Sequence, residues 1–141
     1  MSREKDNLVV AFQGMPGAYS NMACEAYFPN AKTLPCNSFE DMLNSTKNAL
    51  SDYSMVPVEN SLAGRVADIH HLIPDSGLFI VGEHFQRVNH QLLGLKNSNL
   101  EDIETVKSHA QGLAQCRKFI SDHNLSPVQH IDTAGAAEEV S

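Results

Sequence analysis

Hydrophobic and polar positions alternate along this chain between short apolar runs and amphipathic stretches. Residues 8–12 (LVVAF) and 53–58 (YSMVPV) are nearly unbroken apolar runs, a pattern typical of strands buried on both faces of a sheet. Further strands are predicted at 33–36, 78–88, 91–95, 104–107 and 127–131.

Between these runs, apolar residues recur at spacings of three and four, which predicts helices. Ser38 and Asp41 predict a capping box at the start of the second helix. Pro74 would end the third helix, and two more are predicted at about 110–123 and from Thr133 to Val140. The first two stripes are Tyr19, Met22, Ala23, Ala26 and Tyr27, which Pro29 would end, and Phe39, Met42, Leu43, Thr46, Ala49 and Leu50.

Alternating β and α units predict a mostly parallel sheet with helices on both faces. The hydrophobic pattern changes after residues 74–77 (PDSG), where longer strand-like runs replace the shorter strand and helix patterns. We therefore predict a first lobe over residues 1–74 and a second lobe over 75–141.

Composition narrows the function classes. A formal net charge of −7 argues against nucleic acid or an anionic membrane as the main partner, because both need a basic face. The three cysteines are scattered and form no CxxC pair, and no histidine set has metal-ligand spacing. Neither GxGxxG nor a Walker pattern is present, so nucleotide binding is not supported. We expect a soluble, reduced, cytoplasmic protein without a metal site.

Polar clusters follow four predicted strands, at residues 13–20, 59–61, 108–111 and 132–133. Because ligands bind at the carboxyl ends of strands in open α/β sheets, these clusters predict one cleft. Gly14 in the first cluster precedes a helix whose N-terminus favours an anion, although a tight turn that binds nothing has the same pattern.

The other clusters leave two interpretations open. Ser108, Gln111 and Gln115 share one face near the start of a helix, which suits either a cleft wall or an N-capping serine followed by solvated glutamines. Asp132 and Thr133 are likewise either cleft residues or N-caps.

Four segments in register carry a resemblance to a known family. They are residues 12–20 (FQGMPGAYS), 56–64 (VPVENSLAG), 108–116 (SHAQGLAQC) and 132–137 (DTAGAA). Each is similar to a signature of the prephenate dehydratases, and they occur in the family's order over nearly the whole chain. The pair Gly82-Glu83 also fits.

The resemblance implies a two-lobed α/β fold similar to type II periplasmic binding proteins, with the substrate cleft between the lobes. It implies a lyase of L-phenylalanine biosynthesis that converts prephenate to phenylpyruvate, carbon dioxide and water without a cofactor or metal. The expected partners are prephenate and further copies of the chain, in a homodimer or higher homo-oligomer.

Family roles carry over only where residues match. Asn60, Ser108 and Gln115 match catalytic positions, and each can donate a hydrogen bond to a carboxylate or hydroxyl oxygen without adding fixed positive charge. The substrate-binding candidates are Ser20, Glu59, Ser61, Gln111 and Asp132.

Two departures from the family pattern matter. Ala110 stands where the family usually has a proline at a helix start, which should cost little. The family's Thr-Arg-Phe segment and its regulatory ACT domain are not among these 141 residues, so the chain alone is expected to be weakly active or inactive, with an incomplete second lobe. The alternatives are an arogenate dehydratase and a non-catalytic module that binds a small carboxylate.

Overall fold

The computed structural model describes residues 7–141, which form two compact units divided between Arg87 and Val88. The polar segment at residues 1–6 lies outside the described residues. The predicted lobe boundary after residue 74 falls earlier in the chain and stays a prediction. Each unit is built around its own parallel strands.

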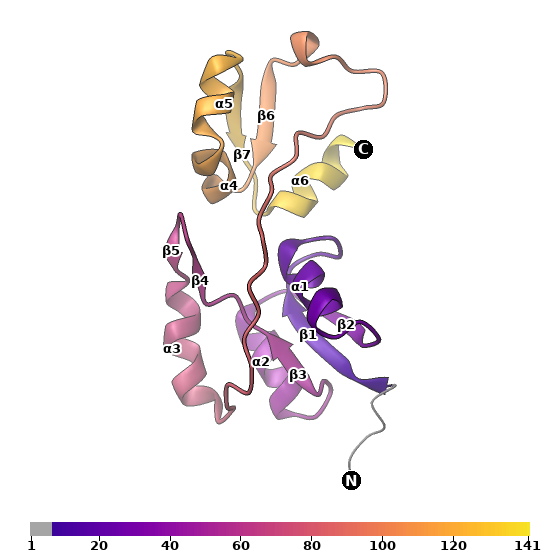
Figure 1. Ribbon diagram of the computed structural model, residues 1–141, viewed down its shortest axis with the longest axis vertical. Coiled ribbons are helices and arrows are strands. Elements are labelled where there is room, and N and C mark those ends of the chain that lie inside the picture. The colour runs from indigo at the N-terminus through magenta and orange to yellow at the C-terminus, as the bar shows by residue number, and fades with distance from the viewer. Residues whose placement is uncertain (1–6) are drawn as a thin grey trace. The chain divides into compact units, whose positions relative to one another are not determined.

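The first unit contains a three-stranded parallel sheet in the order β2-β1-β3 (Figure 1). The central strand β1 (Val9–Gln13) pairs with β2 (Lys32–Cys36) on one side and with β3 (Tyr53–Met55) on the other. Residues 10–12 of β1 are fully buried, because successive side chains point to opposite faces and both faces are covered. The prediction of a strand buried on both faces is confirmed.

Helices cover the two faces of this sheet. One face packs against α1 (Tyr19–Tyr27), and the other packs against α2 (Phe39–Lys47) and α3 (Ala67–Ser76). Alternation along β1 therefore divides the core into two clusters. The clusters are Val10, Phe12 and Cys24 on the α1 face, and Ala11, Met42, Leu43 and Ile69 on the α2–α3 face.

Local signals set the start of α2 but not the buried face of α1. The Ser38 hydroxyl accepts a hydrogen bond from the Asp41 backbone N–H at 3.1 Å, so the predicted cap is confirmed. In α1 the predicted stripe is partly wrong, because Met22 and Tyr27 are 43% and 44% exposed while Asn21 is buried. Asn21 turns inward to bind the preceding loop, which shifts the buried face.

The end of α3 differs from the prediction. Pro74 lies inside the last turn, and the helix continues to Ser76 before Gly77 caps it with a φ of 74°. Proline removes only the bond to the residue four earlier, so the next residues stay helical. The left-handed conformation that ends the helix suits glycine.

A short antiparallel hairpin, which sequence did not predict, follows β3. It consists of β4 (Glu59–Asn60) and β5 (Gly64–Arg65). This hairpin carries the second polar cluster ahead of α3.

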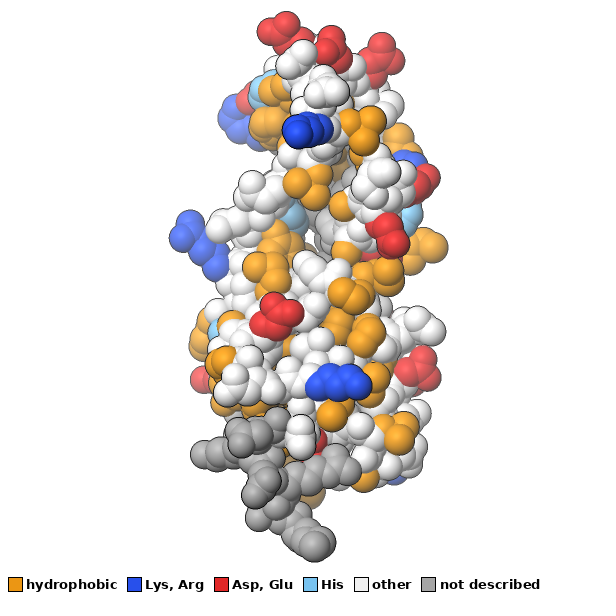
Figure 2. All heavy atoms as spheres, turned by 90° about the vertical axis from the view of Figure 1, so that its right-hand side faces the viewer, with side chains coloured by type: hydrophobic (Ala, Val, Ile, Leu, Met, Phe, Trp, Pro, Cys, Tyr) orange, Lys and Arg blue, Asp and Glu red, His pale blue; other side chains and the backbone are white. Residues whose placement is uncertain are grey.

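The predicted strands at 78–88 and 91–95 are wrong. Residues 77–96 run without helix or strand (Figure 1), and the side chains of Phe79 and Phe85 are 88% and 87% exposed. A strand needs neighbouring backbone groups to pair with, and these residues pair with no strand among residues 7–141. Figure 2 shows hydrophobic side chains at the surface, with polar and charged groups between them.

The second unit pairs β6 (Thr105–Ser108) in parallel with β7 (Ser126–Gln129). The 3-10 turn η2 (Leu100–Asp102) precedes β6, and α6 (Thr133–Val140) follows β7 with the predicted bounds. In both units a β-α-β-α order places a helix between parallel strands. The mixed α/β class, with mainly parallel sheets and flanking helices, is confirmed.

The predicted helix at 110–123 is interrupted. It consists of α4 (Ala110–Gln115) and α5 (Arg117–Asp122), separated by Cys116. The Cys116 N–H is shared between the carbonyls of Gly112 and Leu113 at 3.1 and 3.2 Å, a tightened turn that breaks the α-helical pattern. Across residues 7–141, none of the helices has the length and apolar character needed to cross a membrane.

Candidate functional site

The glycine loop after β1 is held by its own hydrogen bonds. The Gly14 N–H donates to the Cys36 carbonyl at 3.0 Å, and the Gly17 N–H donates to Asn21 Oδ1 at 2.9 Å. Both glycines have positive φ, 118° and 86°, which other residues rarely adopt. Asn21 is 5% exposed and also donates to Glu25 Oε1 at 3.1 Å. Sequence reasoning missed Asn21, although its place four residues after Gly17 is a usable signal.

Ser20 lies in the first turn of α1 and is half-buried. The N-cap of this helix is Ala18, whose methyl side chain accepts no hydrogen bond. The first-turn N–H groups and the positive end of the helix dipole therefore suit an anionic group. Anion binding at this turn stays a prediction beside the interpretation as a tight turn.

Asn60 has its amide oxygen engaged in the β4–β5 hairpin. Its Oδ1 accepts from the backbone N–H of Leu62 at 2.9 Å and of Ala63 at 3.1 Å. Because the amide is planar, these bonds fix the direction of the NH2 arm. Glu59 and Ser61 flank Asn60 and are exposed.

Ser108 ends β6 and is half-buried. It does not cap α4, because the cap is His109, whose Nδ1 accepts from the Gln111 N–H at 3.2 Å. The N-capping interpretation of Ser108 is therefore wrong, and Gln111 lies exposed in the first helical turn. A Cβ at Gly112 would lie 3.0 Å from the Ser108 hydroxyl, so glycine leaves that hydroxyl its space.

Gln115 is the last residue of α4 and is half-buried. Its Oε1 lies 2.6 Å from Nε2 of His90. Since an amide oxygen only accepts, the imidazole donates from Nε2. Sequence reasoning missed His90, which lies in a segment without periodic structure that would mark an inward-facing position.

Asp132 is the N-cap of α6, and its carboxylate accepts from the Gly135 N–H. The ambiguity between Asp132 and Thr133 as N-cap is resolved in favour of Asp132. A carboxylate there also stabilises the helix dipole. Its predicted role in substrate binding stays a prediction.

A charged network ties α6 to β6. Glu139 accepts from Lys107 Nζ at 2.9 Å and lies 3.3 Å from Nε2 of His130. The hydrogen bond from Lys107, together with its charge, lowers the pKa of Glu139. His130 also donates its backbone N–H to the Ser108 carbonyl at 2.8 Å, so this network supports the strand end that carries Ser108.

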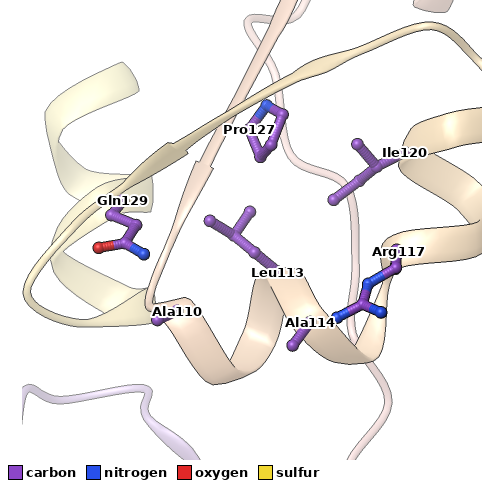
Figure 3. Close-up of a pocket in the computed structure, with 7 residues that line it drawn as sticks. All are labelled: Ala110, Leu113, Ala114, Arg117, Ile120, Pro127 and Gln129. Carbon is purple, nitrogen blue, oxygen red and sulfur yellow. The ribbon is translucent and has the colours of Figure 1, made fainter.

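A pocket of about 260 Å³ lies in the second unit between the α4–α5 helices and β7 (Figure 3). Its walls are mainly apolar, with one guanidinium and one amide, and none of the eight predicted site residues lines it. The lining residues are Ala110, Leu113, Ala114, Arg117, Ile120, Pro127 and Gln129. Elsewhere among the described residues, no group of three or more His, Cys, Asp or Glu side chains is placed to hold a metal ion.

Comparisons with known proteins place this chain in a family. The family model for prephenate dehydratase matches residues 10–141. A bifunctional N-acyl-homoserine lactone acylase/prephenate dehydratase from Komagataeibacter europaeus is 50% identical over 94% of this chain and 47% of its own length. The arogenate dehydratase/prephenate dehydratase 2 of Arabidopsis thaliana is 39% identical over 93% of this chain and 34% of its own length.

Solved structures agree with these relatives. A quorum-quenching acylase, GqqA, has a TM-score of 0.84 at 50% identity and matches 94% of this chain and 48% of its own. The Staphylococcus aureus prephenate dehydratase has a TM-score of 0.78 at 23% identity, over 95% of this chain and 52% of its own, which shows the shared fold. The chain thus spans about half the length or less of the relatives it matches. With a family model covering all but its first nine residues, the chain belongs to the prephenate dehydratase family.

Proposed function

We propose that this chain contributes to a prephenate dehydratase, which converts prephenate to phenylpyruvate, carbon dioxide and water. The single observation that carries the proposal is the family match over residues 10–141, which includes all four polar segments. The hydrogen-bonded amides of Asn60 and Gln115 support it.

The chemistry requires donors more than it requires a charged catalyst. The bond from the ring to its carboxylate breaks, its electron pair enters the ring, and the C–O bond at the opposite carbon breaks. The hydroxyl leaves with one proton as water, so a proton donor must reach that oxygen. Asn60, Ser108 and Gln115 supply hydrogen-bond donors for carboxylate and hydroxyl oxygens, which orient the substrate.

In the first unit, backbone N–H groups are the proposed ligands of an anionic group. The first turn of α1, with Ser20, presents N–H groups suited to one substrate carboxylate. Glu59, Ser61, Gln111 and Asp132 remain proposed as substrate-binding or supporting residues.

The experiment measures phenylpyruvate through the absorbance of its enolate in alkali. Residues 1–141 would be assayed alone and joined to the second half of the Komagataeibacter europaeus relative, which is 50% identical over the shared part. We expect turnover from the joined protein and little or none from the 141 residues alone. Asn60→Ala or Gln115→Ala should lower kcat about 100-fold or more, the usual cost of removing one donor to developing charge.

Asn44→Ala is the matched control, because Asn44 is an exposed residue on α2 outside the polar segments. It should leave turnover unchanged. A joined protein that binds prephenate without converting it would contradict the proposal and favour a carboxylate-binding module. Equal losses for Asn44→Ala and Asn60→Ala would contradict the assignment of Asn60.

Two further activities are proposed as alternatives because relatives carry them in their names. One is arogenate dehydration, on a substrate that replaces the keto group of prephenate with an amine. The other is hydrolysis of N-acyl-homoserine lactones. Parallel assays with arogenate and with an acyl-homoserine lactone would rank the three activities by kcat/KM. Assembly as a homodimer or higher oligomer, and a cytoplasmic location, stay predictions.

A further inference from the structure

A histidine outside the four polar segments is bonded to one of the proposed donors. His90 Nε2 lies 2.6 Å from Gln115 Oε1, and the two residues are 25 positions apart in the chain. Both side chains are half-buried, whereas Asn89 and Gln91 on either side of His90 are exposed. The imidazole is therefore turned inward from an irregular segment to meet the end of α4.

The direction of this bond determines what Gln115 can offer a ligand. The terminal torsion of glutamine is broad and roughly two-fold, so a half-turn exchanges its oxygen and its NH2 group. A donor on Oε1 selects one of these two orientations. Without that selection, the amide oxygen would face an anionic substrate for part of the time and repel it.

We propose that His90 is a positioning residue for Gln115, donating from Nε2 so that the amide NH2 arm is presented to the substrate. The inference rests on the proposed function, in which Gln115 donates to a carboxylate or hydroxyl oxygen. His90 itself touches no reacting atom in this role. Its effect on turnover passes through the amide.

The tautomer of His90 tests the bond without any enzymatic assay. In the 141-residue chain, the imidazole 15N shifts of the neutral ring should show a proton on Nε2 and none on Nδ1. A through-space contact from that proton to the Gln115 side chain should accompany it. A proton on Nδ1 instead would overturn the proposal, because Nε2 would then have nothing to donate.

Three substitutions separate positioning from simple packing in the joined protein. His90→Phe keeps a ring of similar size but removes the donor, and kcat/KM should fall about 2- to 10-fold, as expected for one neutral hydrogen bond. His90→Gln restores a donor at nearly the Nε2 position and should recover most of the activity. His90→Asn, whose amide is shorter, should not. His84→Phe is the control, since His84 is exposed in the same segment and bonds to Gln86.

A double-mutant cycle gives the decisive outcome. If His90 acts through Gln115, then His90→Phe should cost nothing further in a Gln115→Ala background. An equal loss in both backgrounds, or no rescue by His90→Gln, would overturn the positioning role. Should His90→Phe fail to fold, the tautomer and the comparison of His90→Gln with His90→Asn still decide the matter. Absence of dehydratase turnover from the unsubstituted joined protein refutes the proposed function itself, and with it the donor role of Gln115, whatever the tautomer.

Discussion

Replacing Asn21 by alanine removes the side chain that fixes the glycine loop against α1. The Asn21 side chain is 5% exposed, accepts from the Gly17 N–H at 2.9 Å and donates to Glu25 at 3.1 Å. Alanine at this position makes neither bond. The Gly17 N–H then loses its partner at the entrance to the proposed anion site.

The expected loss of stability follows from these contacts. A typical intramolecular hydrogen bond contributes about 1 kcal/mol net, so two bonds contribute about 2 kcal/mol. Alanine recovers about 0.6 kcal/mol through its higher helix propensity. The free energy of unfolding of the first unit should therefore fall by about 1–2 kcal/mol.

Urea denaturation and amide hydrogen exchange measure this change in the chain. The denaturation midpoint should fall with an unchanged slope, and the Gly17 amide proton should exchange faster. Asn44→Ala, the same substitution at an exposed site on α2, should change stability by less than about 0.5 kcal/mol. Asn21→Asp should keep the Gly17 bond but repel Glu25, and should regain stability when combined with Glu25→Gln. Equal effects of Asn21→Ala and Asn44→Ala, with unchanged exchange at Gly17, would refute the reasoning.

Other predictions concern titration and capping. Burial raises the pKa of the Cys24 thiol from 9.0 to about 11. The stability gained by keeping this thiol neutral is therefore complete below pH 9 and is lost as pH rises through about 11. In alkaline urea titrations, the free energy of unfolding of the protein should fall by up to about 2–3 kcal/mol relative to that of Cys24→Ala. Lys107 lowers the pKa of Glu139, so the stability that this ion pair contributes is lost as pH falls through the folded pKa of Glu139. Lys107→Met should therefore raise that pKa, which carboxyl 13C shifts would measure, and an unchanged pKa would contradict the assigned cause. Asp132→Ala would remove the carboxylate that accepts from the Gly135 N–H and should destabilise α6 by about 1 kcal/mol, the usual worth of an N-cap, seen as faster amide exchange in that helix.

Sequence alone predicted the strands and helices that are determined by residues close together in the chain. The apolar run at residues 8–12 is the buried central strand, and the Ser38 cap begins α2 as expected. The bounds of α6 also match, since Asp132 supplies its own cap. In each case the residues that decide the structure lie within a few positions of one another.

The failures depend on partners that lie far away in the chain. Residues 78–88 have strand-like composition, yet no described segment pairs with them, so they stay irregular. The buried face of α1 depends on Asn21 reaching back to Gly17, which outweighs the apolar stripe. Composition records the propensity of a segment, whereas pairing and burial are set by what packs against it.

The candidate site shows the same division. The segment that contains Gln115 could be predicted from sequence, but its partner His90 lies 25 residues earlier in a segment with no regular pattern. The role of Ser108 also needed geometry, because His109 rather than Ser108 caps α4. A motif identifies which residues are present, and only the structure shows which atoms are already engaged.

The two proposed amide donors share one feature that bears on the ligand. Asn60 Oδ1 is held by backbone N–H groups of its hairpin, and Gln115 Oε1 is held by His90. In both residues a hydrogen bond to the amide oxygen orients the NH2 group, although the donors come from different parts of the chain. In each amide the oxygen accepts, so only the NH2 group can donate. Donation is the polarity that the proposed function requires of each residue toward a carboxylate or hydroxyl oxygen.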